Sequence, residues 1–194
     1  MALRTGIRLR VATGSAVAVA LGSVALAGAL VTAAGTRADG RELSQRLVPA
    51  AAAAGDLFSL YQTQETWVRD YVTSGHSGTL APFHDEATKI RMAQDQIERL
   101  THGYGQVTKQ LNATEAAEQA WLASVAGPQL AATGRGNFGT ANALQADIAH
   151  TRPYVLAIRS AGAAMQAQIT DAQQKVTSKF GRAQGTLLAA LIVI

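Results

Sequence analysis

Apolar positions recur every three or four residues along most of the chain, and no stretch alternates apolar with polar residues as a half-buried strand does. Between residues 37 and 182 this spacing predicts four helical segments, each with one apolar face. The first is expected to end near Ser74 and Gly75, and Pro49 is expected to interrupt or kink it. Its predicted apolar face consists of Leu43, Leu47, Ala50, Ala54, Leu57, Tyr61, Val68 and Tyr71.

The second segment is predicted to start after Ser77 and Gly78 and to continue through Leu111. Its apolar face combines Leu80, Phe83, Ala87, Ile90, Ile97, Leu100, Tyr104, Val107 and Leu111. Asn112 followed by Glu115 is typical of a capping box, so a third segment is predicted to begin there. Its expected buried positions are Ala117, Trp121 and Val125.

The glycines of Gly134–Asn137 are expected to end the third segment, and a short piece over Thr140–His150 follows. Thr151–Pro153 is typical of a helix start. The fourth segment carries Tyr154, Ile158, Ala161, Met165, Ile169, Ala172, Val176 and Phe180. Segments of about 33 to 38 residues each span about 50 Å as helices. Helices of matched length joined by short turns predict an all-α fold, an up-down-up-down four-helix bundle.

The N-terminal part of the chain has the features of a membrane anchor. Residues 11–36 carry no charge, and a bilayer-spanning helix needs about 20 such residues. The arginines of residues 1–10 precede this stretch, and basic residues stay on the cytoplasmic side. We therefore expect a cytoplasmic N-terminus, a transmembrane helix over 11–36 and an extracytoplasmic region over 37–182. The alternative is a signal peptide cleaved at Ala27–Ala29, although the uncharged stretch is longer than the usual apolar core of such a peptide.

The C-terminal stretch from Gly185 to Ile194 is uncharged and mostly apolar, and it follows Lys179 and Arg182. Ten residues reach about 15 Å as a helix, which is half of a bilayer core. We interpret residues 183–194 as the start of a second transmembrane helix that is truncated at the end of the chain. The alternative is a final hydrophobic turn packed in a core.

The charge of the chain is concentrated at one end. There are 17 Lys and Arg residues against 13 Asp and Glu residues, a net charge of +4. Three of the basic residues lie in residues 1–10 without an acidic neighbour, so the excess is no basic face and no nucleic-acid partner is expected. Because the chain has no Cys, disulfides, thiolate metal sites and cysteine nucleophiles are excluded.

Three blocks of residues carry a resemblance to a known family. They are Glu65-Thr66-Trp67-Val68-Arg69-Asp70-Tyr71-Val72-Thr73-Ser74-Gly75, then Leu80-Ala81-Pro82-Phe83 with Ala87, and finally Ile158-Arg159. The first block resembles the E-T-x-x-R-x-Y-x-x-(T)-G signature of the CHASE domain, type 3, and the other two are similar to stretches that follow it in that family. The resemblance covers about residues 40 to 182.

This resemblance implies an extracytoplasmic four-helix sensory bundle between two membrane helices, in the plasma membrane of a bacterium. The usual hosts are membrane sensors, most often histidine kinases, whose output module follows the second span. The ligands of the family are mostly unknown, so the resemblance assigns no binding residues. The residues that match the family motifs are interpreted as structural: Glu65, Thr66, Arg69, Tyr71, Gly75, Leu80, Pro82, Phe83, Ala87 and Arg159.

The sequence contains no pattern typical of catalysis. It has no phosphate-binding glycine loop, nucleophile elbow or kinase ATP-binding glycines, so no catalytic residue and no cofactor is predicted. Glu65 and Arg69 are four residues apart and are predicted to form a helix ion pair. Trp67 and Trp121 are interpreted as core residues, with a small-molecule slot between helices as the alternative. No metal site is predicted from the scattered histidines, which are His76, His84, His102 and His150.

Two hypotheses for the function follow. In the first, the chain is the input domain, with its anchors, of a bacterial membrane receptor, and its partners are the lipid bilayer, a second copy of itself and an unidentified extracytoplasmic stimulus or ligand. In the second, it is a stand-alone adaptor or scaffold, membrane-anchored or secreted, without catalytic output. An enzyme in its own right is not supported, because no catalytic motif occurs.

Overall fold

The structure is a computed structural model that describes residues 34–35 and 37–192, with side chains as far as Ala183. Within these ranges the chain is helical almost throughout and contains no strand, so the all-α prediction is confirmed. The chain divides into two compact units. One is Ser44–Gln174, and the other combines residues 1–43 with residues 175–194.

A π-helical turn, Leu43–Leu47, leads into the first long α-helix. The α-helices are α2 (Val48–Ser74), α3 (Leu80–Leu100), α4 (Gly105–Trp121), α5 (Gly127–Gly134), α6 (Phe138–Ala146) and α7 (Ile148–Ile192). A short 3-10 turn over Ser77–Thr79 precedes α3, and a second π-helical turn over Leu122–Ala126 joins α4 to α5.

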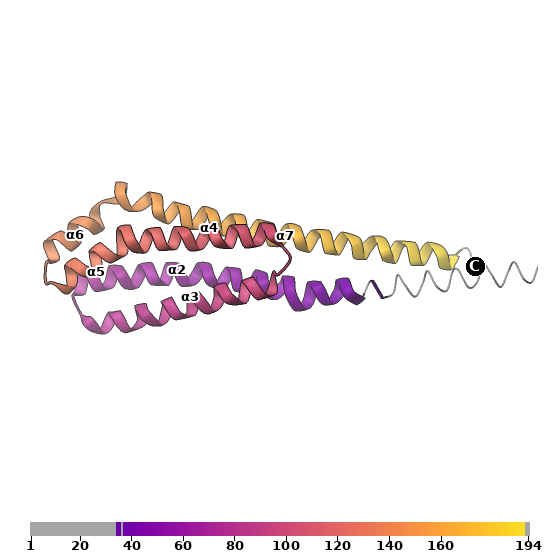
Figure 1. Cartoon of the computed structure of the whole chain (residues 1–194), viewed down its shortest axis with the longest axis horizontal. Coiled ribbons are helices and arrows are strands. Elements are labelled where there is room, and N and C mark those ends of the chain that lie inside the picture. The colour runs from indigo at the N-terminus through magenta and orange to yellow at the C-terminus, as the bar shows by residue number, and fades with distance from the viewer. Residues whose placement is uncertain (1–33, 36, 193–194) are drawn as a thin grey trace, which may run out of the picture. The chain divides into compact units, whose positions relative to one another are not determined.

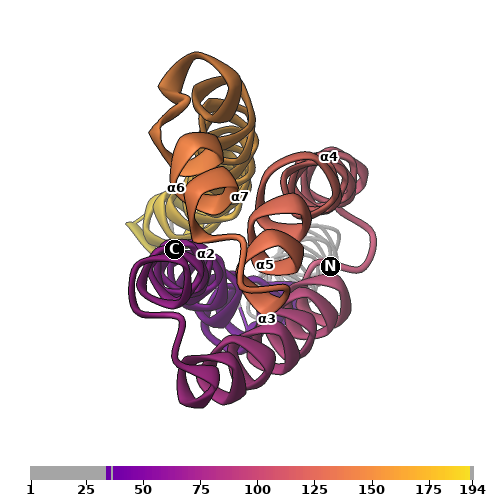
Figure 2. The same cartoon turned by 90° about the vertical axis from the view of Figure 1, so that its left-hand side faces the viewer.

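The unit Ser44–Gln174 is a helical bundle. Figures 1 and 2 show α2, α3, α4 and the first part of α7 lying lengthwise beside one another, with neighbours in the sequence running in opposite directions. The short helices α5 and α6 lie at the end of the bundle where α2 turns into α3. The bundle interior is therefore made from the faces that four helices turn toward one another.

The apolar face predicted for the first segment forms much of this interior. Every member of that predicted face from Leu47 to Tyr71 is buried, and Leu43 is half-buried. The helix ends where expected, because Gly75 adopts the left-handed conformation at φ 66° and its N–H donates to the Tyr71 carbonyl at 2.8 Å. Pro49 lies in the first turn of α2, directly after the π-helical turn, so the regular α-helical hydrogen bonding is interrupted just before this proline, as expected.

The prediction of one long segment through Leu111 is wrong. The helix ends at Leu100, because the N–H and the hydroxyl of Thr101 both donate to the Ile97 carbonyl and Gly103 adopts φ 91°. The apolar spacing continues across this turn because Val107 and Leu111 face the same core from the next helix. Periodicity alone therefore cannot separate one helix from two.

An arginine from the start of the unit holds this turn. The guanidinium of Arg46 donates to the Leu100 carbonyl at 3.0 Å and to the His102 carbonyl, and it lies 5.7 Å from the centre of the Tyr104 ring. The prediction of a capping box at residues 112–115 is also wrong, because Asn112 and Glu115 both lie inside α4.

The starts of the last two helices also differ from the predictions. α6 covers Phe138–Ala146 rather than residues 140–150, and the Asn137 carboxamide oxygen caps it by accepting from the Thr140 N–H at 3.3 Å. α7 begins at Ile148 rather than at Thr151–Pro153, because the Asp147 carboxylate accepts from the His150 N–H at 3.0 Å. Pro153 therefore lies inside the helix.

Residues 11–33, which make up most of the predicted first transmembrane helix, lie outside the described residues. None of the helices in the described part of the chain has the length and hydropathy needed to cross a membrane.

Candidate functional site

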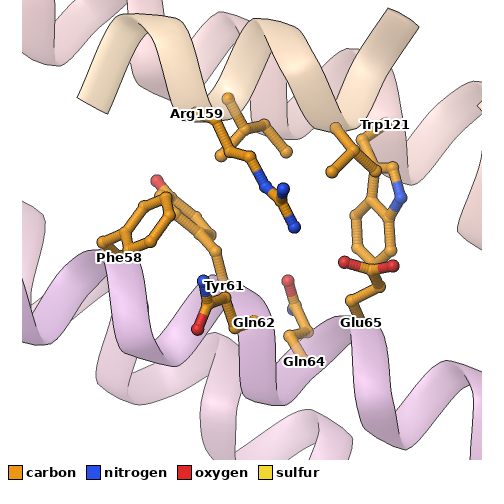
Figure 3. Close-up of a pocket in the computed structure, with 9 residues that line it drawn as sticks. Phe58, Tyr61, Gln62, Gln64, Glu65, Trp121 and Arg159 are labelled. Carbon is orange, nitrogen blue, oxygen red and sulfur yellow. The ribbon is translucent and has the colours of Figure 1, made fainter. Parts of the chain in front are cut away.

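A cleft lies between α2, α4 and α7 in the Ser44–Gln174 unit (Figure 3). It encloses about 350 Å³ of space, part of which is open to solvent. Its lining residues are Phe58, Tyr61, Gln62, Gln64 and Glu65 of α2, Trp121 of α4, and Val155, Ile158 and Arg159 of α7.

The helical repeat explains how these residues come together. Positions three and four residues apart share one face of a helix, so successive turns of α2 present Phe58, Tyr61 and Glu65 on one side. On α7, Val155 and Arg159 share a face for the same reason. Trp121 closes the cleft from the last residue of α4, just before the π-helical turn.

Gln64 is the most unusual residue of the cleft. Its side chain is only 1% exposed, and neither its Nε2 nor its Oε1 has a hydrogen-bond partner in the protein. Most buried polar side chains make at least one hydrogen bond, so such an amide needs an explanation. Figure 3 shows its amide group directed toward the guanidinium of Arg159, into the space that the cleft residues surround.

Charged groups of both signs border this space. The exposed side chain of Arg159 extends from α7 toward α2 (Figure 3), and its guanidinium makes no hydrogen bond or ion pair with the described residues. Glu65 lies beside Trp121 in the same view, and its Oε1 accepts from Arg69 Nη2 at 3.1 Å. The predicted ion pair between Glu65 and Arg69 is therefore confirmed.

A second cleft adjoins the first and shares Glu65, Trp121 and Val155 with it. It encloses about 410 Å³, again partly open to solvent, and its remaining lining residues are Val68, Arg69, Val125, Gln129, Gln145 and Thr151. The polar surface around Glu65 thus continues from one cleft to the other.

Tyr61 connects the wall of the first cleft to a buried polar network. Its hydroxyl donates to Glu118 Oε2 at 3.2 Å, and Gln94 Nε2 donates to both the Tyr61 hydroxyl and Glu118 Oε2 at 3.0 Å. Burial raises the pKa of Tyr61 and of Glu118, and the two hydrogen bonds that Glu118 accepts oppose its shift. Each group in this network has a partner, so the network joins α2, α3 and α4.

The residues that match the family motifs separate into two groups. Glu65 and Arg159 line the first cleft, and Arg69 lines the second. The others lie in α2, in α3 or between them and line neither cleft, and they are Thr66, Tyr71, Gly75, Leu80, Pro82, Phe83 and Ala87.

Several of these motif residues make contacts at or near the α2–α3 turn. Tyr71 and Phe83 are buried, and the Thr66 hydroxyl donates to the Gln62 carbonyl at 3.0 Å. A side chain on Gly75 would meet Phe138 of α6 at 2.5 Å, in addition to requiring a positive φ.

The two tryptophans have different surroundings. Trp121 is buried and lines both clefts, whereas Trp67 lines neither and packs against the core. The slot considered for both therefore involves Trp121 alone. In the part of the chain that the structure describes, no group of three or more His, Asp or Glu residues lies close enough together to hold a metal ion.

Comparison with known proteins gives one result. A family model for the CHASE3 domain matches residues 41–179. No curated protein and no solved structure matches the chain significantly. The CHASE3 domain is an extracellular sensory domain of signalling proteins, and the chain belongs to this family.

Proposed function

We propose that this chain is the extracytoplasmic sensory domain, with its membrane anchors, of a bacterial signal-transduction receptor, and that the receptor is a two-component sensor histidine kinase. The observation that carries the proposal is the family match over residues 41–179, directly preceded by the uncharged stretch 11–36 and its N-terminal arginines. Residues 37–182 then form a four-helix sensory bundle outside the cell.

The proposed route of the signal is α7. One continuous helix runs from Ile148 to Ile192, so residues that line the cleft belong to the same helix as residues 183–192 of the proposed second span. A stimulus that moves α7 against α2 is passed on along this helix to an output module beyond the second span. The proposal includes a homodimer in the bilayer, and signalling requires two discrete arrangements of the helices.

Single cysteines test the topology, because the chain has no Cys of its own. Ser77→Cys places a thiol at the exposed α2–α3 turn, and Thr5→Cys places one before the first proposed span. With a membrane-impermeant maleimide on intact spheroplasts, we expect Ser77→Cys to be labelled at once and Thr5→Cys only after permeabilisation. Labelling of Ser77→Cys only after permeabilisation would contradict the proposal.

The kinase part needs a separate test. An antibody to residues 80–110 is used to detect the native protein in membrane fractions. We expect a band well above the 20.2 kDa of this chain, followed by detection of autophosphorylation in that band. A membrane band near 20.2 kDa would contradict the kinase and support an adaptor.

A further inference from the structure

We propose that the second cleft, which α2, the α4–α5 junction, α6 and α7 enclose, binds a neutral polyhydroxy ligand of the size of a monosaccharide. The inference deepens the proposed sensory function and rests on it, because it names the class of stimulus. This cleft has about 80 Å³ in which water molecules can be centred, against about 20 Å³ in the first cleft. At about 10 to 15 Å³ per water, the second cleft holds about five to eight waters and the first only one or two.

The first feature that carries the proposal is a buried amide facing this space. Gln129 of α5 lines the second cleft and is only 5% exposed, and its side-chain amide makes no hydrogen bond with the described residues. Unlike the amide atoms of Gln64, its Nε2 and Oε1 are not sealed from solvent. Because buried polar groups normally have a partner, the Gln129 amide offers a donor and an acceptor to a molecule in the cleft.

The second feature is the indole N–H of Trp121. This side chain is 4% exposed, and its Nε1 makes no hydrogen bond with the described residues, although it is not sealed from solvent either. Figure 3 shows the nitrogen on the edge of the ring away from Arg159. Trp121, Val125 and Gln129 line the second cleft at intervals of four residues across the π-helical turn Leu122–Ala126. Such turns are frequent at functional sites, and this one places two unpartnered polar groups in one wall.

The third feature is that the charges of the cleft cancel. Glu65 and Arg69 are the only charged residues among those that line it, and Arg69 Nη2 donates to Glu65 Oε1 at 3.1 Å. Glu65 repels an anion at this place and Arg69 repels a cation, whereas a neutral ligand meets neither cost. The pair still offers Glu65 Oε2 as an acceptor and further Arg69 N–H groups as donors.

A ring that carries several hydroxyl groups matches this combination. Each hydroxyl donates one hydrogen bond and accepts up to two, so neighbouring hydroxyls satisfy planar side chains that present donors and acceptors side by side. Gln129, Gln145 and the Glu65–Arg69 pair are side chains of this kind. A single sugar ring displaces about as many waters as the cleft holds, whereas a nucleotide or a peptide is larger. Apolar surface for the C–H groups of the ring comes from three valines, Val68, Val125 and Val155.

Isothermal titration of the full 194-residue chain in mild detergent tests the site, with D-glucose, D-galactose and D-mannose as neutral probes. We expect saturable binding of at least one of them at one molecule per chain. The amino sugar and the uronate of the same series, such as D-glucosamine and D-glucuronate for D-glucose, carry a charge and should bind at least about tenfold more weakly. The proposal is overturned if the folded wild-type chain binds none of the neutral sugars, or if the neutral and charged members of a series bind equally well.

Two variants and a matched control locate the binding. Gln129→Leu should weaken binding of the sugar at least about tenfold without lowering the melting temperature, because the amide that it removes has no partner in the protein. Gln64→Leu makes the same change at a buried glutamine whose amide is sealed from solvent, so it should change binding less than about twofold.

The second variant does not depend on a core substitution. Gln145→Ala, at a half-buried position of α6, should weaken binding at least about threefold. Wild-type binding by both Gln129→Leu and Gln145→Ala would overturn the site, and so would a loss in Gln64→Leu as large as the loss in Gln129→Leu.

The two proposals fail separately. Labelling of Ser77→Cys in spheroplasts reports on the sensory topology, and titration of the purified chain reports on the cleft. A correctly oriented membrane protein that binds no neutral sugar refutes only the ligand class. A chain that binds a sugar but is labelled only after permeabilisation refutes only the proposed receptor.

Discussion

Tyr61 and Gln64 are buried polar residues on α2, three positions apart. The side chain of one is hydrogen-bonded to neighbouring helices and that of the other is not. Tyr61 faces α3 and α4 and shares hydrogen bonds with Gln94 and Glu118. Gln64 is more completely buried, yet its amide has no partner in the protein. A satisfied buried network fixes one packing arrangement, whereas a buried amide without a partner costs stability. The comparison separates a stabilising polar group from a destabilising one within one turn of helix.

The largest expected effect is in the satisfied network. Glu118→Ala leaves the Tyr61 hydroxyl without its acceptor, removes one of the two acceptors of the Gln94 amide and opens a cavity, so we expect a loss of about 2 to 4 kcal/mol in the free energy of unfolding. Urea denaturation followed by circular dichroism measures it. Glu118→Gln keeps an acceptor oxygen and should lose about 1 kcal/mol. If Glu118→Ala is as stable as the wild type, the network does not hold α2, α3 and α4 together.

For Gln64, we expect a substitution to raise the free energy of unfolding rather than lower it. Gln64→Leu removes the desolvation cost of an amide that has no partner, so the free energy of unfolding should rise by about 1 to 2 kcal/mol. The same denaturation experiment measures it, and Gln62→Leu, at a less buried position of the same helix, is the control. A destabilised Gln64→Leu would mean that the amide is satisfied in the native protein.

A pH titration distinguishes the two regions by charge. The folded-state pKa of Glu118 is raised above its ordinary value of 4.5, mainly by burial, so the folded state binds protons more readily than the unfolded chain. This contribution to stability is complete below pH 4.5 and is lost as the pH rises through the folded-state pKa. Glu115 contributes with the same sign, because burial, Glu98 and Asp95 raise its pKa.

The prediction is that unfolding free energy decreases with pH just above the ordinary glutamate range, and that Glu118→Gln flattens this decrease. Gln64→Leu should leave the slope unchanged, because Gln64 does not titrate. Equal slopes in the wild type and Glu118→Gln would show that Glu118 has the same pKa in the folded and unfolded states.

The smallest effect is expected at the surface ion pair. Arg69 and Glu65 are 61% and 33% exposed, so Arg69→Gln should cost no more than about 0.5 kcal/mol. Arg159→Gln should change stability even less, because Arg159 has no charged partner among the described residues. Thermal unfolding of the two variants at low and high salt measures both. A loss above about 2 kcal/mol in Arg159→Gln would mean that this arginine is a structural residue.

Local signals predicted part of the fold. Gly75 ends α2 where the serine and glycine suggested, and the apolar face of the first segment is buried as expected. The break between α3 and α4 was not predicted, because apolar residues on both sides of Thr101 face one core and continue the same spacing. A turn held by Arg46, more than fifty positions earlier in the chain, leaves little trace in local sequence.

The candidate site was less accessible to prediction. Spacing alone gave the Glu65–Arg69 pair, and the family resemblance drew attention to Arg159 without a role for it. The cleft itself depends on which faces of α2, α4 and α7 meet, and a single sequence does not contain that information. One signal was present, since Gln64 and Glu118 are polar residues at positions where the helical spacing calls for apolar ones.

Urea unfolding of the wild type, Glu118→Ala and Gln64→Leu under identical conditions tests the central claim most directly. We expect Glu118→Ala to lower the free energy of unfolding, because it removes the acceptor of a buried network, and Gln64→Leu to raise it, because it removes a buried amide that has no partner. A loss in both variants, or no change in either, would contradict the distinction between a satisfied and an unsatisfied buried polar group on α2.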